Sequence, residues 1–158
     1  MASRTFHFKK FSVVDGDIKI HIDLSRFDKQ FQDAQFALDG QVMHDMLPFM
    51  PMIQGNFIHE TEIVSKSLQG SGVVCAGAGP FGRFLYEGKV MVDEVTGSAW
   101  ARKYGRKITT ATPLKYTGRD YVGPHPNVTD HWFDAAKKIK LKNWVNMVKR
   151  IAGGGKRG

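Results

Sequence analysis

A run of apolar residues with helical spacing constrains this fold more than any other feature of the sequence. Phe27, Phe31, Ala34, Leu38 and Val42 follow one another at steps of four, three, four and four positions. Such steps keep the five side chains on one face of an α-helix. The sequence therefore predicts one long helix in its N-terminal third.

The same segment carries signals for where this helix begins and ends. Ser25 is a residue type that caps helix N-termini, and Asp28 in the first turn complements the positive end of the helix dipole. Pro48 and Pro51 cannot continue a helix. These residues predict a helix from about Ser25 to Met46.

Strand-like segments lie on both sides of the helix. Before it, apolar and polar residues alternate around Asp15-Gly16, a dipeptide typical of tight β-hairpin turns, so residues 11–23 are predicted to form a hairpin. After it, residues 57–67 and 72–78 are β-prone and glycine-punctuated, which predicts two strands. Residues 80–88, with Pro80 at the start and Gly88 at the end, predict a short helix. Residues 90–95 predict a strand, and residues 109–121 an edge strand or an extended arm.

The C-terminal apolar residues form two sets, over 132–139 and over 141–151, each at helical spacing. On one unbroken helix the two sets would point about 120° apart and would place Lys137 and Lys140 inside the apolar arc. This pattern predicts a break near Lys140 and hence two helices. Thr129 is expected to cap the first, with Asp130 in its first turn. Glycines 153–155 end the second, and residues 153–158 are expected to form a flexible tail.

Length and composition fit one globular domain. The chain has 158 residues, 42% of them hydrophobic, and contains no run of about 18 apolar residues that would predict a membrane span. The predicted fold class is α+β, with the long N-terminal helix packed on a small antiparallel sheet, an N-terminal β-hairpin and two C-terminal helices. The domain is expected to span residues 1–152, with an arm or insertion at 90–121. The predicted core residues are Phe27, Phe31, Leu38, Val42, Leu85, Trp132, Phe133, Trp144 and Val148.

No residue pattern predicts catalysis, a metal site or a cofactor. Cys75 lies in an apolar stretch, which indicates a buried thiol rather than a nucleophile. The histidines form no HExxH pair, and the glycines of residues 77–82 do not complete a phosphate-binding loop. His125, Asp130 and His131 come closest to an acid–base cluster. They leave a small hydrolase as an alternative that lacks a nucleophile in reach by sequence.

The chain is basic, with 23 lysines and arginines against 15 acidic residues and a formal net charge of +8. One basic cluster is interleaved with Trp100 and Tyr104, a combination that suits contact with a phosphate backbone. No base-reading motif accompanies it, so an alternative function is sequence-independent DNA binding. The basic residues of this cluster are Arg102, Lys103, Arg106 and Lys107.

Three segments, taken in order, resemble a known family. They are PFMPM at 48–52 followed by Gly55, PFGRFLYEGK at 80–89, and HP at 125–126 followed by HWFDAAK at 131–137. These segments resemble the minor capsid proteins of siphophages of Gram-positive bacteria, which are related to the neck and tail-completion proteins of long-tailed phages. The family pattern is roughly PYVPxxxG, PYARxLYYGK and HPxxxxHWFxxAK. This chain departs from it at Ile53-Gln54, where Asp-Thr is common, at Phe81-Gly82 in place of Tyr-Ala, and at Glu87 in place of Tyr.

The resemblance implies a bacteriophage virion protein without enzymatic activity. It implies a homo-oligomeric ring in the neck that joins head to tail, with six copies by analogy with tail rings, and heterologous subunit contacts. Its expected neighbours are the head-closure or connector proteins on one side and the tail terminator or tube on the other. Its basic cluster is expected to face packaged DNA in the lumen, and its location to be the virion, after assembly in the host cytoplasm. The expected subunit-interface residues are Phe49, Met50, Met52, Arg83, Tyr86 and Lys89.

Overall fold

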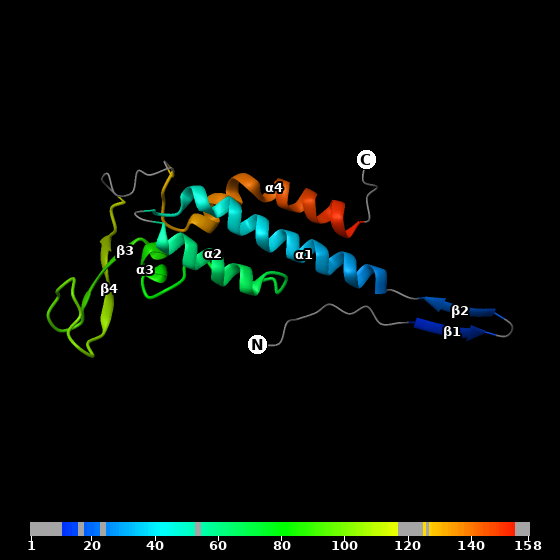
Figure 1. Ribbon diagram of the computed structural model, residues 1–158, viewed down its shortest axis with the longest axis horizontal. Coiled ribbons are helices and arrows are strands. Elements are labelled where there is room, and N and C mark those ends of the chain that lie inside the picture. The colour runs from blue at the N-terminus through cyan, green and yellow to red at the C-terminus, as the bar shows by residue number, and fades with distance from the viewer. Residues whose placement is uncertain are drawn as a thin grey trace.

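The computed structural model describes residues 11–15, 18–22, 25–52, 55–116, 125 and 127–153. Its body is made of three helices, α1 (Ser25–Met46), α2 (Asn56–Leu68) and α4 (Trp132–Ala152). Two antiparallel hairpins lie at opposite ends of this body, β1 (Phe11–Asp15) with β2 (Ile18–Ile22), and β3 (Lys89–Asp93) with β4 (Lys107–Pro113) (Figure 1). Two short helical elements, η1 (Leu47–Phe49) and α3 (Gly82–Glu87), complete the structure. The α+β class is confirmed.

The long helix α1 begins at Ser25 and ends at Met46, which are the predicted limits. It packs chiefly along α4 and also contacts α2, rather than lying on a sheet. The predicted packing of this helix on a sheet is wrong because the segment that follows it folds as a helix instead of two strands. The side-by-side arrangement of the three helices is visible in Figure 1.

The core lies between the C-terminal half of α1 and the neighbouring helices. Trp132, Met50 and Ala136 have no exposed surface, and Met46 has almost none. Val42, Trp132 and Trp144 are confirmed as core residues, while Leu38, Leu85 and Phe133 pack partly buried against them. Val148 is half-buried.

Two residues of the helical face lie outside this core. Phe27 and Phe31 are 46% and 42% exposed, so their prediction as core residues is wrong. The reason is the placement of the second helix, because α2 lies alongside the C-terminal part of α1 only (Figure 1). The apolar face of α1 thus continues past the region where the core closes.

Residues 57–67, predicted as a strand, form helix α2. Its buried residues are Ile58, Thr61 and Ser65, which share one helical face. Two of the three are small polar residues, so the buried face does not appear as a helical spacing of apolar residues. The Thr61 hydroxyl donates to the Phe57 carbonyl at 2.7 Å and accepts from the Ala78 N–H at 3.0 Å. These bonds satisfy the buried hydroxyl in a way that a strand would not allow.

The predicted strand at 72–78 has no regular secondary structure. It lies along α2 and is held there by side chains rather than by a β ladder. The Ser65 hydroxyl donates to the Cys75 carbonyl and accepts from the Cys75 N–H, each at 3.1 Å. Residues 72–78 are therefore anchored to the helix that precedes them, and Cys75 is half-buried.

The C-terminal segment is one continuous helix, α4, so the predicted break near Lys140 is wrong. The prediction assumed that both apolar sets must be buried. The bundle covers only one side of α4, burying Trp132, Ala136 and Trp144 and leaving Ile139 64% exposed. Because Ile139 of the first set and Leu141 and Val145 of the second stay exposed, the lysines between the sets need no burial. The N-cap is His131 rather than Thr129, and the acidic residue of the first turn is Asp134.

The remaining predicted elements agree with the structure. The N-terminal hairpin is confirmed, with Phe11 opposite Ile22 and Asp15 opposite Ile18. The short helix α3 ends at Gly88, and β3 covers most of the predicted strand at 90–95. The structure describes the predicted arm at 90–121 only as far as residue 116, and this part contains most of the β3–β4 hairpin. Residues 117–121 of the arm and residues 154–158 of the tail lie outside the described residues. Among the helices described here, none combines the length and the apolar character needed to cross a membrane.

Candidate functional site

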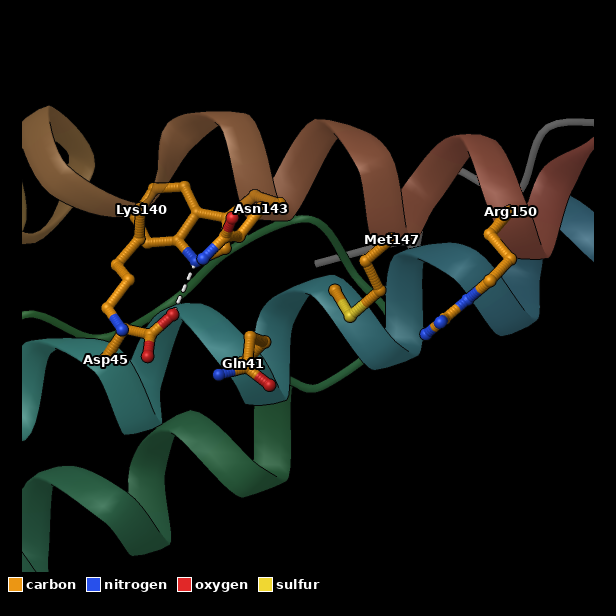
Figure 2. Close-up of a pocket in the computed structure, with 7 residues that line it drawn as sticks. Gln41, Asp45, Lys140, Asn143, Met147 and Arg150 are labelled. Carbon is orange, nitrogen blue, oxygen red and sulfur yellow. Dashed lines mark hydrogen bonds between the residues drawn. The ribbon is translucent and has the colours of Figure 1, made fainter.

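A shallow hollow of about 260 Å³ lies on the seam between α1 and α4. Figure 2 shows its lining, which is mixed in charge and polarity. At its floor the Trp144 Nε1–H donates to Asp45 Oδ2 at 2.7 Å, and this bond holds a nearly buried carboxylate between the two helices. The hollow brings no nucleophile or metal-ligand set together, so we assign it a structural role. Its lining residues are Gln41, Asp45, Lys140, Asn143, Trp144, Met147 and Arg150.

The segment with the strongest functional character is residues 94–106, which join β3 to β4 and which we call the Trp100 loop. The β3–β4 hairpin stands at the end of the helical body, away from the α1–α4 seam (Figure 1). Two backbone bonds close the base of the loop, from Asp93 N to Ser98 O at 2.7 Å and from Glu94 N to Arg106 O at 3.0 Å. The loop is therefore a defined structure at the exposed end of the hairpin.

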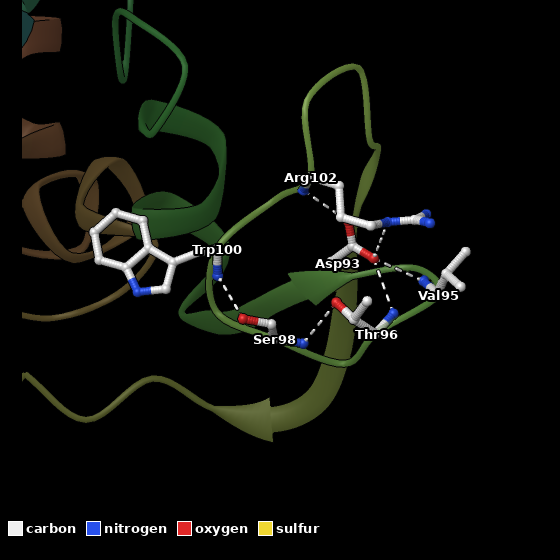
Figure 3. A network of polar contacts seen from close by, with 6 residues as sticks. All are labelled: Asp93, Val95, Thr96, Ser98, Trp100 and Arg102. Atoms are coloured by element: carbon white, nitrogen blue, oxygen red, sulfur yellow. Dashed lines mark hydrogen bonds and ion pairs between the residues drawn. The ribbon is translucent and has the colours of Figure 1, made fainter.

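Asp93 organises the inside of this loop (Figure 3). Its Oδ1 accepts the N–H groups of Val95 at 3.0 Å and Thr96 at 2.9 Å, and its Oδ2 accepts the Arg102 N–H at 3.1 Å. The Arg102 side chain adds an ion pair through Nε at 3.2 Å. Asp93 is only 1% exposed, yet the N–H groups of Thr96 and Arg102 lower the pKa of its carboxyl well below the ordinary value. A buried carboxylate thus fixes both arms of the loop.

The loop is tightly packed around that carboxylate. A side-chain Cβ at Gly105 would lie 2.7 Å from Asp93 Oδ2 and 3.0 Å from the Arg102 carbonyl, so only glycine fits there. The turn before it is closed by a bond from Gly105 N to Arg102 O at 2.7 Å. Tyr104, inside this turn, has a left-handed backbone with φ of 64°. That conformation costs a residue with a side chain about 1–2 kcal/mol, and the surrounding bonds maintain it.

The loop exposes aromatic and basic side chains to solvent. Trp100 is 83% exposed and Tyr104 is 96% exposed, and the Lys103 Nζ lies 5.4 Å from the centre of the Tyr104 ring. The sequence-predicted basic cluster is thus brought together on one loop with both aromatic residues. Arg102, Lys103 and Arg106 are exposed and Lys107 is half-buried. No pattern in the sequence indicates the role of Asp93, because its partner Arg102 comes nine positions later.

A second feature joins the hairpin to the helical body, and we call it the junction (residues 49–52, 86–88 and 129–132). The Thr129 N–H donates to the Phe49 carbonyl at 3.1 Å, and the His131 N–H donates to the Tyr86 carbonyl at 2.9 Å. The Tyr86 ring meets Trp132 edge to face at a centroid distance of 4.9 Å. These contacts bring together parts of all three segments that carry the family resemblance.

The junction is close-packed. Gly88 has φ of 62°, and a Cβ there would lie 2.8 Å from the Cβ of Asp130, so glycine is required both by conformation and by space. The Gly88 carbonyl accepts the Leu114 N–H at 2.6 Å, which ties the chain after β4 to the same point. The junction is therefore the place where the β3–β4 hairpin is anchored.

The expected subunit-interface residues have different environments. Met50 has no exposed surface and belongs to the core of the single chain, so its prediction as an interface residue is wrong. Phe49, Met52 and Tyr86 are half-buried against the core, and Arg83 and Lys89 are exposed. The physical reason for the error is that Met50 follows η1 directly and belongs to the same core cluster as Trp132 of α4.

The histidine cluster considered for hydrolysis is organised around the start of α4. His131 Nε2 lies 3.7 Å from Glu87 Oε2, and His131 Nδ1 lies 3.8 Å from Asp130 Oδ2. The centre of the His131 ring lies 5.0 Å from the centre of the Tyr86 ring. Burial, followed by the nearby carboxylates of Asp134 and Glu87, raises the pKa of Tyr86 above its ordinary value. In the described part of the chain, no group of three or more histidine, cysteine, aspartate or glutamate side chains could hold a metal ion. The contacts of His131 link α3 to α4.

Comparison of the chain with protein-family models, with curated proteins and with solved structures gives no match in any of the three.

Proposed function

We propose that this chain is a structural component of a tailed-phage virion, a minor capsid protein that forms a ring in the neck and joins head to tail. It acts by binding other proteins and catalyses no reaction. Its partners are other copies of itself and the neck proteins on the head and tail sides. It is located in the virion after assembly in the host cytoplasm.

The observation that carries this proposal is the junction. The three segments that resemble the phage family are separated by tens of residues in sequence, and parts of each are in direct contact in the structure. Their contact supports reading the three segments as the signature of one structural unit.

The surface beside the junction suits a subunit contact. Arg83 on α3 and Lys89 at the start of β3 are exposed, while Phe49, Met52 and Tyr86 expose part of their surface. An interface that combines half-buried aromatic residues with arginine is typical of strong protein contacts. In a closed ring this patch would meet a different patch on the next copy.

Light scattering on the full chain, across protein concentration and salt, tests the ring. We expect a discrete oligomer of ring size, and we expect Arg83→Glu to shift it toward monomer while Lys66→Glu on α2 leaves it unchanged. Electron microscopy of virions with a labelled copy of the chain tests the location. Absence of the label from the neck of intact particles would refute the proposal, whatever the oligomeric state of the isolated chain.

A further inference from the structure

The β3–β4 hairpin, which carries the Trp100 loop, is a basic part of the protein. Residues 89–115, which comprise the β3–β4 hairpin and its flanks, contain six lysines and arginines and two acidic residues, a net charge of +4 out of +8 for the chain. One of the two acids, Asp93, is buried and bonded inside the loop. The surface of the hairpin is therefore more basic than its composition indicates, and Glu94 is its one exposed carboxylate.

The aromatic residues of the loop are not used by the fold. Trp132 and Trp144 are buried in the core, whereas Trp100 is 83% exposed. Tyr104 is almost completely exposed and also has an unfavourable backbone conformation. Two aromatic side chains in solvent and local strain at one of them add nothing to folding stability, and such strain is typical of binding sites.

The loop is rigid before any ligand binds. The bonds from Val95, Thr96 and Arg102 to Asp93 fix its shape, and Gly105 packs against the same carboxylate. A preorganised loop loses little conformational entropy when it binds. The backbone that carries the cations and the two aromatic residues is thus fixed before a ligand with negative charge and flat apolar faces binds.

We propose that the Trp100 loop binds single-stranded nucleic acid without sequence preference. Trp100 and Tyr104 stack on unpaired bases, and the neighbouring cations Arg102, Lys103 and Arg106 contact phosphates. Every nucleotide supplies one phosphate and one base face, which is the combination that the loop presents. An acidic protein would match the cations only through a cluster of carboxylates and would leave the outward ring faces without flat partners. This inference goes beyond the proposed virion role and does not depend on ring formation.

Fluorescence provides a direct test, because Trp100 is exposed and the other two tryptophans are buried. The full chain is titrated with the oligonucleotide dT20, with U20, with a blunt 20-base-pair duplex and with polyglutamate, at several salt concentrations. We expect dT20 or U20 to quench Trp100 and to bind more tightly than the duplex or polyglutamate. Three or four phosphate contacts predict a slope of about −2 to −3 for log K against log salt concentration. The comparison of dT20 with U20 identifies the preferred nucleic acid.

Variants separate stacking from charge attraction, with binding measured by anisotropy of labelled dT20. Loss of one stacked base contact in Trp100→Ala is expected to weaken binding about tenfold. Phe81→Ala, which removes another exposed aromatic side chain outside the loop, is the matched control and is expected to change nothing. Because both side chains are exposed, the variants should fold normally, which circular dichroism checks.

Besides equal affinity for the duplex, three results would overturn the inference. They are no binding of dT20 or U20, equal binding by wild type and Trp100→Ala, and equal binding of polyglutamate, which would identify a site for acidic polymers or acidic proteins. Equal affinity for the duplex would likewise remove the stacking argument. None of these results bears on whether the chain forms a ring, which light scattering measures separately.

Discussion

Replacing Thr61 with valine is expected to destabilise the fold although the two side chains have nearly the same shape. Thr61 is fully buried, and its hydroxyl accepts the Ala78 N–H at 3.0 Å while donating to the Phe57 carbonyl at 2.7 Å. Valine keeps the packing but offers no acceptor. The Ala78 N–H would then be left unpaired in a buried position.

A buried donor that loses its partner costs about 1–3 kcal/mol. In a domain of this size, each kcal/mol corresponds to roughly 2–4 °C in melting temperature. We therefore expect Thr61→Val to lower the free energy of unfolding by about 1–3 kcal/mol, with the midpoint of thermal unfolding falling accordingly. Urea denaturation followed by the fluorescence of the buried tryptophans measures this change.

Thr109→Val in β4 is the matched control, since Thr109 is exposed and the same substitution there should stay within about 0.5 kcal/mol of wild type. Thr61→Ser, which keeps the hydroxyl, should retain the Ala78 bond. If Thr61→Val were as stable as Thr109→Val, the hydroxyl would not anchor residues 72–78, and our account of why 57–67 forms a helix would be wrong.

Two other predictions test the loop and the C-terminal helix. Asp93→Asn should accelerate amide hydrogen exchange at Val95, Thr96 and Arg102, because an amide cannot accept all of their N–H groups. The pKa of Asp93 is lower in the folded than in the unfolded chain, so the charged carboxylate stabilises the fold. This stabilisation is complete above a pH of about 4 and is lost as the pH falls below that value. The free energy of unfolding of the wild type should therefore decline more steeply in acid than that of Asp93→Asn. Lys140→Pro should cost about 3 kcal/mol or more relative to Lys140→Ala in urea denaturation, because α4 is continuous there, and tolerance of proline would instead favour two helices.

Several elements could be predicted because their signals are local. The limits of α1 follow from the helix-start signals at Ser25 and Asp28 and from the prolines after Met46, and the N-terminal hairpin follows from alternation around a turn dipeptide. The clustering of Arg102 and Arg106 with Trp100 could also be foreseen, since these residues are close in sequence. In each case the determining interactions join residues only a few positions apart.

Other features depended on distant contacts. Thr61 and Ser65 look β-prone or neutral in isolation, and the docking of residues 72–78 gives both hydroxyls partners outside α2 that the local sequence does not indicate. The continuity of α4 is compatible with the one-sided cover that α1 provides, which leaves Ile139, Leu141 and Val145 exposed. Asp93 became the centre of the loop only when Arg102, nine positions later, returned to it.

The sequence alone thus determined the class of fold, the position of the long helix and the composition of the basic, aromatic loop, because propensities, caps and spacing act over single turns. The tertiary structure decided which apolar residues are core, since burial depends on where neighbouring helices end. It placed Met50 beneath α4 and left Phe27 at the margin of the core. It also brought three separated segments into contact at the junction, because residues far apart in sequence meet only when the helices pack together.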